Sequence, residues 1–187
     1  MRHFILSLAL SLFATGSAWA QTLKSPDGNL VLDFHLSGTE TPVYSLDYKG
    51  KPIIKESKMG FVLHPDYQFN QDFEIVDTKF AESDTTWETV WGQNKEIRDN
   101  HKEMFVALRQ KKTGWLLNIR FRLFDDGLGF RYEFPVQKEL RHFIIMQENT
   151  EFSLAGDHKA FWIPADYDSN EYPVTTCLLY TSPSPRD

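Results

Sequence analysis

The sequence predicts an all-β fold, an antiparallel β-sandwich. Short stretches in which apolar and polar residues alternate recur along the chain, and turn-forming residues separate them. No long stretch of helical periodicity follows the first twenty residues. Short, aromatic-rich strands joined by tight turns are typical of two antiparallel sheets that pack face to face.

The first predicted strands lie at residues 30–36 and 43–48, and a turn at 49–52 leads into an apolar stretch at 53–63. Alternation in the first strand places its apolar side chains on one face, as in a strand that is half buried. That face consists of Leu30, Leu32, Phe34 and Leu36.

The clearest predicted unit is a hairpin that joins residues 103–110 to 115–124 through a turn at 111–114. Gly114 allows this turn to adopt a positive φ. The apolar face of the second strand consists of Trp115, Leu117, Ile119, Phe121 and Leu123.

A second turn at 125–127 leads into a third strand at 128–134, so that three successive strands form an antiparallel meander. The adjacent carboxylates Asp125 and Asp126 are one candidate pair for acid–base chemistry. Neighbouring residues of a strand point to opposite faces, however, and carboxylates in a turn usually cap backbone amides. The structural role is therefore the favoured interpretation for this pair.

Two further strands are predicted at 142–148 and 159–163. In the strand at 128–134, Arg131 and Glu133 are two residues apart and lie on the same face. We expect them to form an ion pair, which would contribute only about 0–1 kcal/mol if it is exposed.

The chain begins with the pattern of a secretory signal. Residues 1–20 combine a basic start at Arg2, an apolar run and small residues before the cleavage position. The apolar run is about half of the roughly 20 residues that a membrane span requires. We therefore expect cleavage near Gln21 and no membrane attachment afterwards. Cys177 is the only cysteine, and an exported chain without disulfides fits a periplasmic location.

The composition argues against nucleic acid as a partner. The chain has 20 Lys and Arg against 26 Asp and Glu, which gives a net charge of −6, and it has no long basic run. It also lacks a phosphate-binding glycine loop and a nucleophile elbow, and its six His residues are scattered singly. The sequence therefore predicts no metal site in this chain.

Residues 165–172 place carboxylates and aromatic rings together, just after Trp162. A calcium loop would need Gly where this chain has Glu171, so that match is poor. Aromatic faces can cover a pyranose ring while carboxylates accept hydrogen bonds from its hydroxyls. The candidate carbohydrate-binding residues are Trp162, Asp166, Tyr167 and Glu171. From residue types alone, a polar surface loop with an aromatic anchor is the favoured alternative.

Five blocks of the sequence resemble, in this order, the amino-terminal domain of glycoside hydrolase family 97. They are SPDGNLVLDFHL, PVYSLDYKGKPIIKESKMGF, TVWGQNKEIRDNHKEMFVAL, FRLFDDGLGFRYEFP and FWIPADYDSNEY. The most specific block runs from Arg122 through Asp126 and Gly127 to Tyr132 and Pro135. The resemblance covers residues 25 to about 172.

This resemblance implies an antiparallel β super-sandwich, similar to galactose-mutarotase-like domains and incomplete at its C-terminal side. The family contains periplasmic α-glucosidases and α-galactosidases, in which the sandwich packs against a (β/α)8 barrel. That barrel holds the catalytic carboxylates and most ligands of a calcium ion. The family's calcium-binding glutamate of the sandwich is expected after Thr176. No catalytic or metal-binding role is therefore transferred to a residue of this chain, and calcium is expected only in a longer parent.

Residues 177–187, CLLYTSPSPRD, resemble the translation of a sequencing adapter, with a disordered natural tail as the alternative. The predicted organisation is therefore a signal peptide at 1–20, a truncated β-sandwich domain at 21–176 and a non-native tail at 177–187. No cofactor is expected in this chain itself.

The expected function is that of the non-catalytic amino-terminal β-sandwich of a periplasmic α-glycosidase. Its expected partners are an α-linked oligosaccharide and the catalytic barrel of the same parent. The alternatives are a free-standing carbohydrate-binding module and a mutarotase-like epimerase, for which the isolated His residues give little support. The parent is expected to be a glycoside hydrolase, and this chain alone is expected to be inactive.

Overall fold

The computed structural model describes residues 20–163 and 173–178, and the regular elements in those ranges are all β-strands. The first half of the chain contains β1 (Gln21–Lys24), β2 (Leu30–Ser37), β3 (Thr41–Tyr48), β4 (Lys51–Lys58), β5 (Phe61–Leu63), β6 (Tyr67–Phe69) and β7 (Phe73–Glu88). The second half contains β8 (Glu96–Gln110), β9 (Leu116–Leu123), β10 (Leu128–Glu133), β11 (Ile145–Glu148), β12 (Lys159–Trp162) and β13 (Thr175–Leu178).

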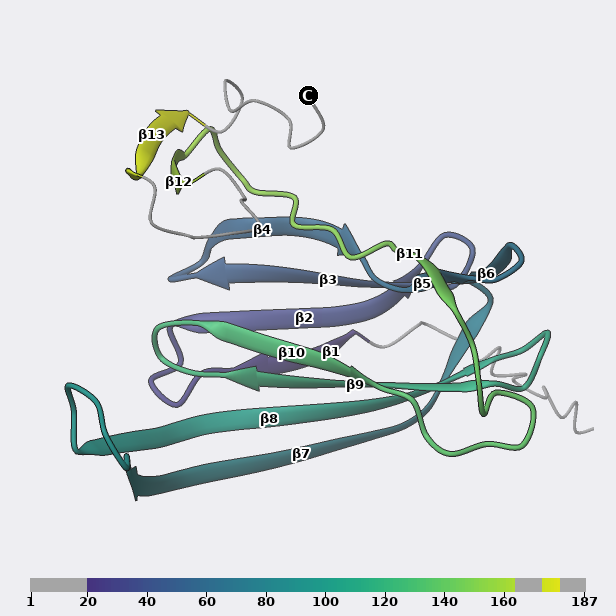
Figure 1. Cartoon of the computed structure of the whole chain (residues 1–187), viewed down its shortest axis with the longest axis horizontal. Helices are drawn as coiled ribbons and strands as arrows, with labels where there is room; N and C mark the ends of the chain where they lie inside the picture. The colour runs from purple at the N-terminus through teal and green to yellow at the C-terminus, as the bar shows by residue number, and fades with distance from the viewer. Residues whose placement is uncertain (1–19, 164–172, 179–187) are drawn as a thin grey trace, which may run out of the picture.

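The strands in these described ranges form four antiparallel sheets. The largest two have the orders β1-β2-β3-β4 and β10-β9-β8-β7, and they lie face to face in Figure 1. A three-stranded sheet has the order β11-β5-β6, and β12 pairs with β13 in a hairpin that lies beyond β4. The predicted all-β antiparallel fold class is therefore confirmed. The described part of the chain contains no helix that is long and apolar enough to cross a membrane.

The hydrophobic core lies between the β1–β4 sheet and the β7–β10 sheet. Phe34 of β2 and Phe121 of β9 meet there with ring centroids 5.6 Å apart, and both side chains are fully buried. Tyr44 of β3 joins them at 6.5 Å from Phe121. Each of the two predicted apolar faces contributes to this core, at positions that include Leu30, Leu32, Phe34, Leu117, Ile119, Phe121 and Leu123.

Two tight turns behave as their sequences predict. Lys49 and Gly50 connect β3 to β4 with φ values of 50° and 73°. Two successive positive φ angles are characteristic of the type I′ turn, whose twist matches that of the flanking strands. Gly114 has φ of 75° in the turn between β8 and β9, as expected.

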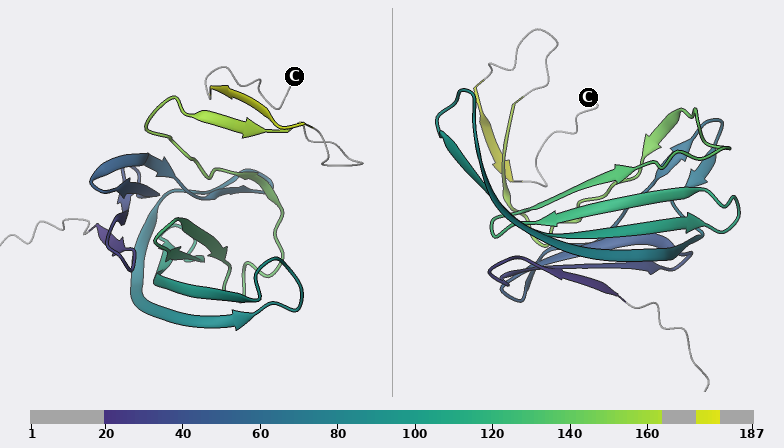
Figure 2. Two further views of the ribbon diagram at one scale, coloured as in Figure 1. Left: turned by 90° about the vertical axis from the view of Figure 1, so that its left-hand side faces the viewer. Right: turned by 90° about the horizontal axis from the view of Figure 1, so that it is seen from below.

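The longest strands, β7 and β8, form a hairpin that extends past the core. Their pairing runs from Phe73 and Gln110 to Glu88 and Glu96. In Figure 1 the tip of this hairpin projects beyond the ends of the other strands, and Figure 2 shows β7 bending around the sandwich. The far half of β7 has almost no buried residue. Its sequence therefore lacks the alternation of apolar and polar residues from which a half-buried strand is predicted.

The later strands differ from their predicted bounds only at the ends. The strand predicted at 142–148 is confined to β11, and the one predicted at 159–163 ends at Trp162. The last strand, β13, includes Cys177 and Leu178, the first two residues of the predicted non-native tail. The proposed origin of that tail stays a prediction.

Candidate functional site

The predicted carbohydrate site lies at the β12–β13 hairpin. Trp162 is the last residue of β12, where it is half buried and opposite Thr175 of β13. The other three predicted residues, Asp166, Tyr167 and Glu171, lie outside the described residues. The structure therefore positions one of the four predicted side chains.

Trp162 carries a buried indole N–H. Its Nε1 atom is inaccessible to solvent and has no hydrogen-bond partner among the described residues. Buried donors are almost always paired, because an unpaired one loses the hydrogen bond it makes to water. The neighbouring Phe161 points to the opposite face of the strand and is 72% exposed. This hairpin thus combines a buried donor without a partner among the described residues on one face with an exposed aromatic ring on the other.

A second candidate site is a cluster of charged side chains on the outer face of the β7–β10 sheet, which we call the arginine cluster. It consists of Glu103, Arg120, Arg122, Arg131 and Glu133. Arg120 is central, because it donates hydrogen bonds to both Glu103 and Glu133, the latter over 2.7 Å from Nε. Its guanidinium carbon also lies 4.9 Å from the ring centroid of Phe105.

The outer members complete the network. Arg122 donates from Nε to Glu103 over 2.9 Å, and Arg131 donates to Glu133 over 2.8 Å. The ion pair expected between Arg131 and Glu133 is therefore confirmed. Both carboxylates accept from two arginines, so the cluster has three positive and two negative charges.

The electrostatics of the arginine cluster keep its carboxylates ionised. Burial by itself raises the pKa of Glu103, but the hydrogen bonds from Arg122 and Arg120 outweigh that effect and the pKa is lowered overall. The hydrogen bond from Arg120 is the main cause of the lowered pKa of Glu133. A general acid needs a carboxyl that holds its proton near neutral pH. The pKa values of these two carboxyls are lowered instead, so they release their protons easily and the cluster is unsuited to acid–base catalysis.

The arginine cluster borders a small cavity of about 170 Å³. Its lining consists of Arg120, Arg122, Phe124, Gly129, Phe130 and Arg131. Binding pockets for drug-sized ligands usually measure roughly 300–1,000 Å³. The cavity therefore has room for one small polar group rather than for a whole oligosaccharide. Sequence reasoning missed this site, since it identified only the pair of Arg131 and Glu133.

The turn at 125–127 has a structural role. Asp125 accepts a hydrogen bond of 2.8 Å from the backbone N–H of Asp27, in the turn between β1 and β2. The predicted capping role is thus confirmed for Asp125, and the donor belongs to a distant segment. Acid–base chemistry by the pair with Asp126 has no support in this geometry.

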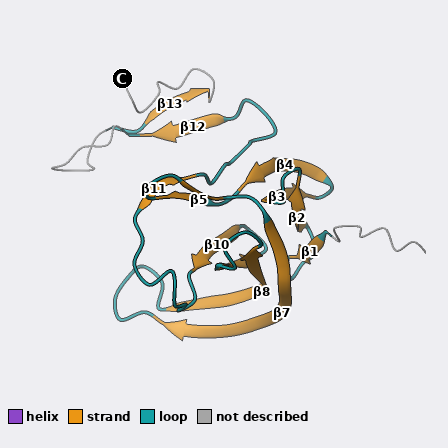
Figure 3. Ribbon diagram, turned by 90° about the vertical axis from the view of Figure 1, so that its right-hand side faces the viewer, coloured by secondary structure: helices purple, strands orange, loops and turns teal. Residues whose placement is uncertain are grey.

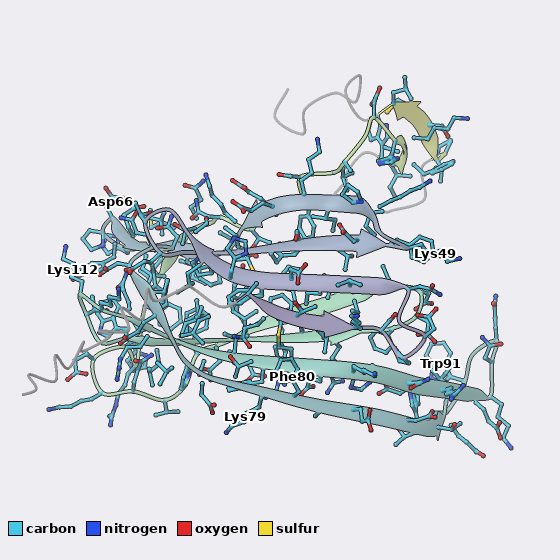
Figure 4. The ribbon with its side chains drawn as sticks, turned by 180° about the vertical axis from the view of Figure 1, so that it is seen from behind. Lys49, Asp66, Lys79, Phe80, Trp91 and Lys112 are labelled. Carbon is cyan, nitrogen blue, oxygen red and sulfur yellow. The ribbon has the colours of Figure 1, made fainter. Side chains whose placement is uncertain are left out.

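Aromatic side chains also gather at the tip of the β7–β8 hairpin. Val90 and Trp91 are 98% and 88% exposed, and Trp87 is about half exposed. Figure 4 shows Trp91 at the end of the hairpin, far from the core. Sequence reasoning did not single out these residues, whose local sequence lacks a strand or helix period.

The described residues form no metal site. They contain no group of three or more His, Cys, Asp or Glu side chains that could hold a metal ion. The calcium ion that the family resemblance implies for a longer parent therefore has no fitting set of ligands in 20–163 and 173–178. No chemistry of this chain is assigned to a metal.

Comparisons with known proteins identify the relatives of this chain. Residues 23–184 match the family described as glycosyl-hydrolase 97 N-terminal. Among curated proteins, the chain is similar to the retaining alpha-galactosidase of Bacteroides thetaiotaomicron, with 26% identity over 156 residues. That alignment covers 82% of this chain and 22% of the galactosidase.

Solved structures show the same relationship. A glycoside hydrolase family 97 enzyme from Pseudoalteromonas sp. strain K8, in complex with acarbose, matches with a TM-score of 0.77 and 34% identity. The match covers 84% of this chain and 24% of that enzyme. A beta-arabinopyranosidase shares the fold, with a TM-score of 0.67 and 22% identity over 75% of this chain and 22% of its own.

The chain spans about a quarter of the length of each of these relatives. The family match covers nearly all of the described residues, and the fold and the order of the sequence blocks agree with it. This chain belongs to the glycosyl-hydrolase 97 N-terminal family.

Proposed function

We propose that this chain is the non-catalytic amino-terminal β-sandwich of a periplasmic family-97 α-glycosidase. The full parent would hydrolyse α-glucosides or α-galactosides, and the sandwich would pack against its catalytic barrel and contact the oligosaccharide. The observation that carries this proposal is the family match over residues 23–184 in a chain that spans about a quarter of its relatives. The periplasmic location rests on the signal pattern in residues 1–20.

The chemistry of the described side chains supports a non-catalytic role. Glu103 and Glu133 share Arg120, are each held by two arginines and have lowered pKa values. Glycoside hydrolysis needs one carboxyl that delivers a proton to the leaving oxygen. Calcium would belong to the longer parent, and its ligands are not assigned to the described residues.

A direct test is hydrolysis of aryl α-glucosides and α-galactosides by the purified chain. We expect no turnover above the background, with or without added calcium. The matched control is the Pseudoalteromonas enzyme that the structure resembles, assayed in the same buffers. Calcium-dependent turnover by the chain alone would overturn the proposal.

The second candidate function is a free-standing carbohydrate-binding module, and the unpartnered indole N–H of Trp162 favours it. Under this alternative, maltose or galactose at millimolar concentration changes the tryptophan fluorescence, and Trp162→Phe abolishes that change because it removes the donor. Trp91→Phe, at the exposed hairpin tip, is the control that leaves the change intact. An unchanged spectrum at millimolar sugar would eliminate the module. The Trp162 result would also show whether Asp166, Tyr167 and Glu171 merit substitution.

A further inference from the structure

Two open sheet edges lie side by side on one flank of the sandwich. In the described residues, β1 pairs with β2 alone and β7 pairs with β8 alone, so each ends its sheet. In the end-on view of Figure 3 the first part of β7 passes next to β1. An unpaired edge exposes backbone N–H and C=O groups that can pair with another strand.

Cavities separate these two edges at both ends of β1. The first measures about 410 Å³ and lies between Gln21, at the start of β1, and the residues Phe73 to Ile75 of β7. The second measures about 570 Å³ and lies between Pro26, just after β1, and Glu82 to Asp84 of β7. The two edges thus run in the same direction with open space at each end. We call this feature the edge groove.

The backbone of β1 presents hydrogen-bonding groups to the edge groove. The backbone N–H of Ser25 donates to the carbonyl oxygen of Leu30 in β2 over 3.0 Å. Leu23, two residues earlier and opposite Leu32, directs its backbone groups toward β2 in the same way. In an antiparallel pair, the residues in between direct their N–H and C=O groups the other way. Thr22 and Lys24 therefore direct theirs to the open edge.

The side chains of β7 present an apolar floor to the same groove. Phe80 is paired with Met104, and Thr78 with Val106, and both partners are fully buried core residues. Directly opposite residues share a face of the sheet, so Phe80 and Thr78 face the interior as well. Phe80 is nevertheless 56% exposed, because the opposing sheet ends at β1.

Thr78 has an unsatisfied polar group there. Its Oγ1 atom is buried and has no hydrogen-bond partner among the described residues. Figure 4 shows Phe80 on the side of β7 nearest β1, whereas Lys79 lies on the opposite side. The exposed phenyl ring of Phe80 and the unpaired hydroxyl of Thr78 both indicate that a further segment packs on this face of β7.

We infer that the edge groove accepts one extended strand, contributed by the stretch that follows this segment in the longer family-97 chains. The inference rests on the proposed function, since the relatives are about four times as long as this segment. The strand hydrogen-bonds to Thr22 and Lys24 and packs an apolar side chain against Phe80. It brings one polar group to Thr78. Its side chains alternate, with apolar ones directed inward.

The charges along the edge groove agree with this occupant. One end is lined by Glu40, Glu74 and Lys111, of which Glu40 and Lys111 pair, and the other end is lined by Glu82, Asp84 and Lys102. Charges of both signs with an apolar centre suit a neutral polypeptide strand better than a polyanion or a strongly basic peptide.

The test uses overlapping synthetic peptides that cover the stretch after the matched quarter of the Pseudoalteromonas enzyme, added to this chain. We expect one peptide to slow amide hydrogen exchange at Thr22 and Lys24 by about tenfold or more. Without peptide, both amides exchange rapidly and the chain is monomeric.

Two pairs of variants sharpen this test. Phe80→Ala weakens the peptide's affinity by about tenfold, whereas Lys79→Ala, on the other face, leaves it unchanged. Thr22→Pro removes an outward N–H and weakens binding, whereas Thr22→Ala loses the same hydroxyl bond to Asp33 but keeps the N–H.

The inference is overturned if no peptide protects these amides, or if Phe80→Ala and Lys79→Ala have equal effects. Protection of both amides in a dimer of the chain alone would also overturn it, because the occupant would then be a second copy. These results are independent of the hydrolysis assay. Turnover by the chain alone would contradict the proposed function, but it would not change how the peptide-binding result is interpreted.

Discussion

Phe34 and Phe121 join the two large sheets through their rings, whose centroids are 5.6 Å apart at the centre of the sandwich. Phe121 also lies within 6.5 Å of the Tyr44 ring and 5.9 Å of the Phe130 ring. The stability of the sandwich should therefore depend strongly on this side chain.

Phe121→Ala is expected to lower the free energy of unfolding by about 3–5 kcal/mol, since it removes buried apolar area and leaves a cavity. Urea denaturation followed by circular dichroism measures the change. Trp91→Ala, at the exposed hairpin tip, serves as the control and should change stability by about 0.5 kcal/mol or less. Equal effects of the two substitutions would contradict the position of the core.

Gly60→Ala should destabilise the junction between β4 and β5. Gly60 has φ of 133°, and a Cβ atom there would lie 2.6 Å from the Cα of Asn70. Overpacking against backbone typically costs about 1–3 kcal/mol, and the unfavourable φ adds to it. Gly127→Ala is the matched control, because a Cβ atom there has no neighbour within 4 Å. Thermal melting that ranks the two variants equally would contradict the close approach.

The pH dependence of stability should reflect the arginine cluster. Since the folded-state pKa of Glu103 lies below its ordinary value of 4.5, its ionised form stabilises the folded chain. That contribution is complete above the ordinary value and is lost as the pH falls through the lowered one. Glu103→Gln should therefore cost about 1–3 kcal/mol at neutral pH.

The cost of Glu103→Gln should shrink as the pH falls below about 4.5, where the carboxyl of the unfolded chain takes up a proton, and it should be smallest below the lowered pKa of the folded chain. Urea denaturation of both proteins across this range measures the difference. Glu139→Gln is the control at an exposed position. A cost for Glu103→Gln that is constant down to low pH would show that the arginines do not act on the carboxylate.

Asp27 should titrate at unusually low pH. Its pKa is lowered from 3.8 to about 2, chiefly because the Ser25 hydroxyl donates a hydrogen bond of 2.5 Å to the carboxylate. Ser25→Ala should move the titration midpoint back towards 3.8, and by more than Asn29→Ala does. Side-chain NMR across the acidic range measures both midpoints. A wild-type midpoint near 3.8 would rule out this hydrogen-bond arrangement.

The core strands could be predicted from the sequence because they are buried on one face. Leu117, Ile119 and Phe121 alternate with polar residues, and the structure places them in the core as expected. No part of β7 was predicted as a strand, and its far half projects past the core and is exposed on both faces. The strands β1 and β6 are too short for a periodic signal.

The candidate sites, like the strands, could be predicted from the sequence only in part. Trp162 could be identified from its residue type, but the environment of its indole N–H depends on folded packing. The arginine cluster depends on register, because Arg120 lies directly opposite Phe105 and reaches the two glutamates diagonally. A shift of one residue between strands would move every one of these side chains to the other face. Sequence alone does not define that register.

The pairing of β5 with β11 bears on the order of folding during synthesis. Phe61 of β5 is opposite Glu148 of β11, so these partners leave the ribosome far apart in time. The β2–β3–β4 meander can form from local contacts much earlier. Until the later segment emerges, one edge of β5 stays open to pairing errors or to chaperones. Slowing translation between these two segments should therefore lengthen the interval during which a nascent chain is vulnerable.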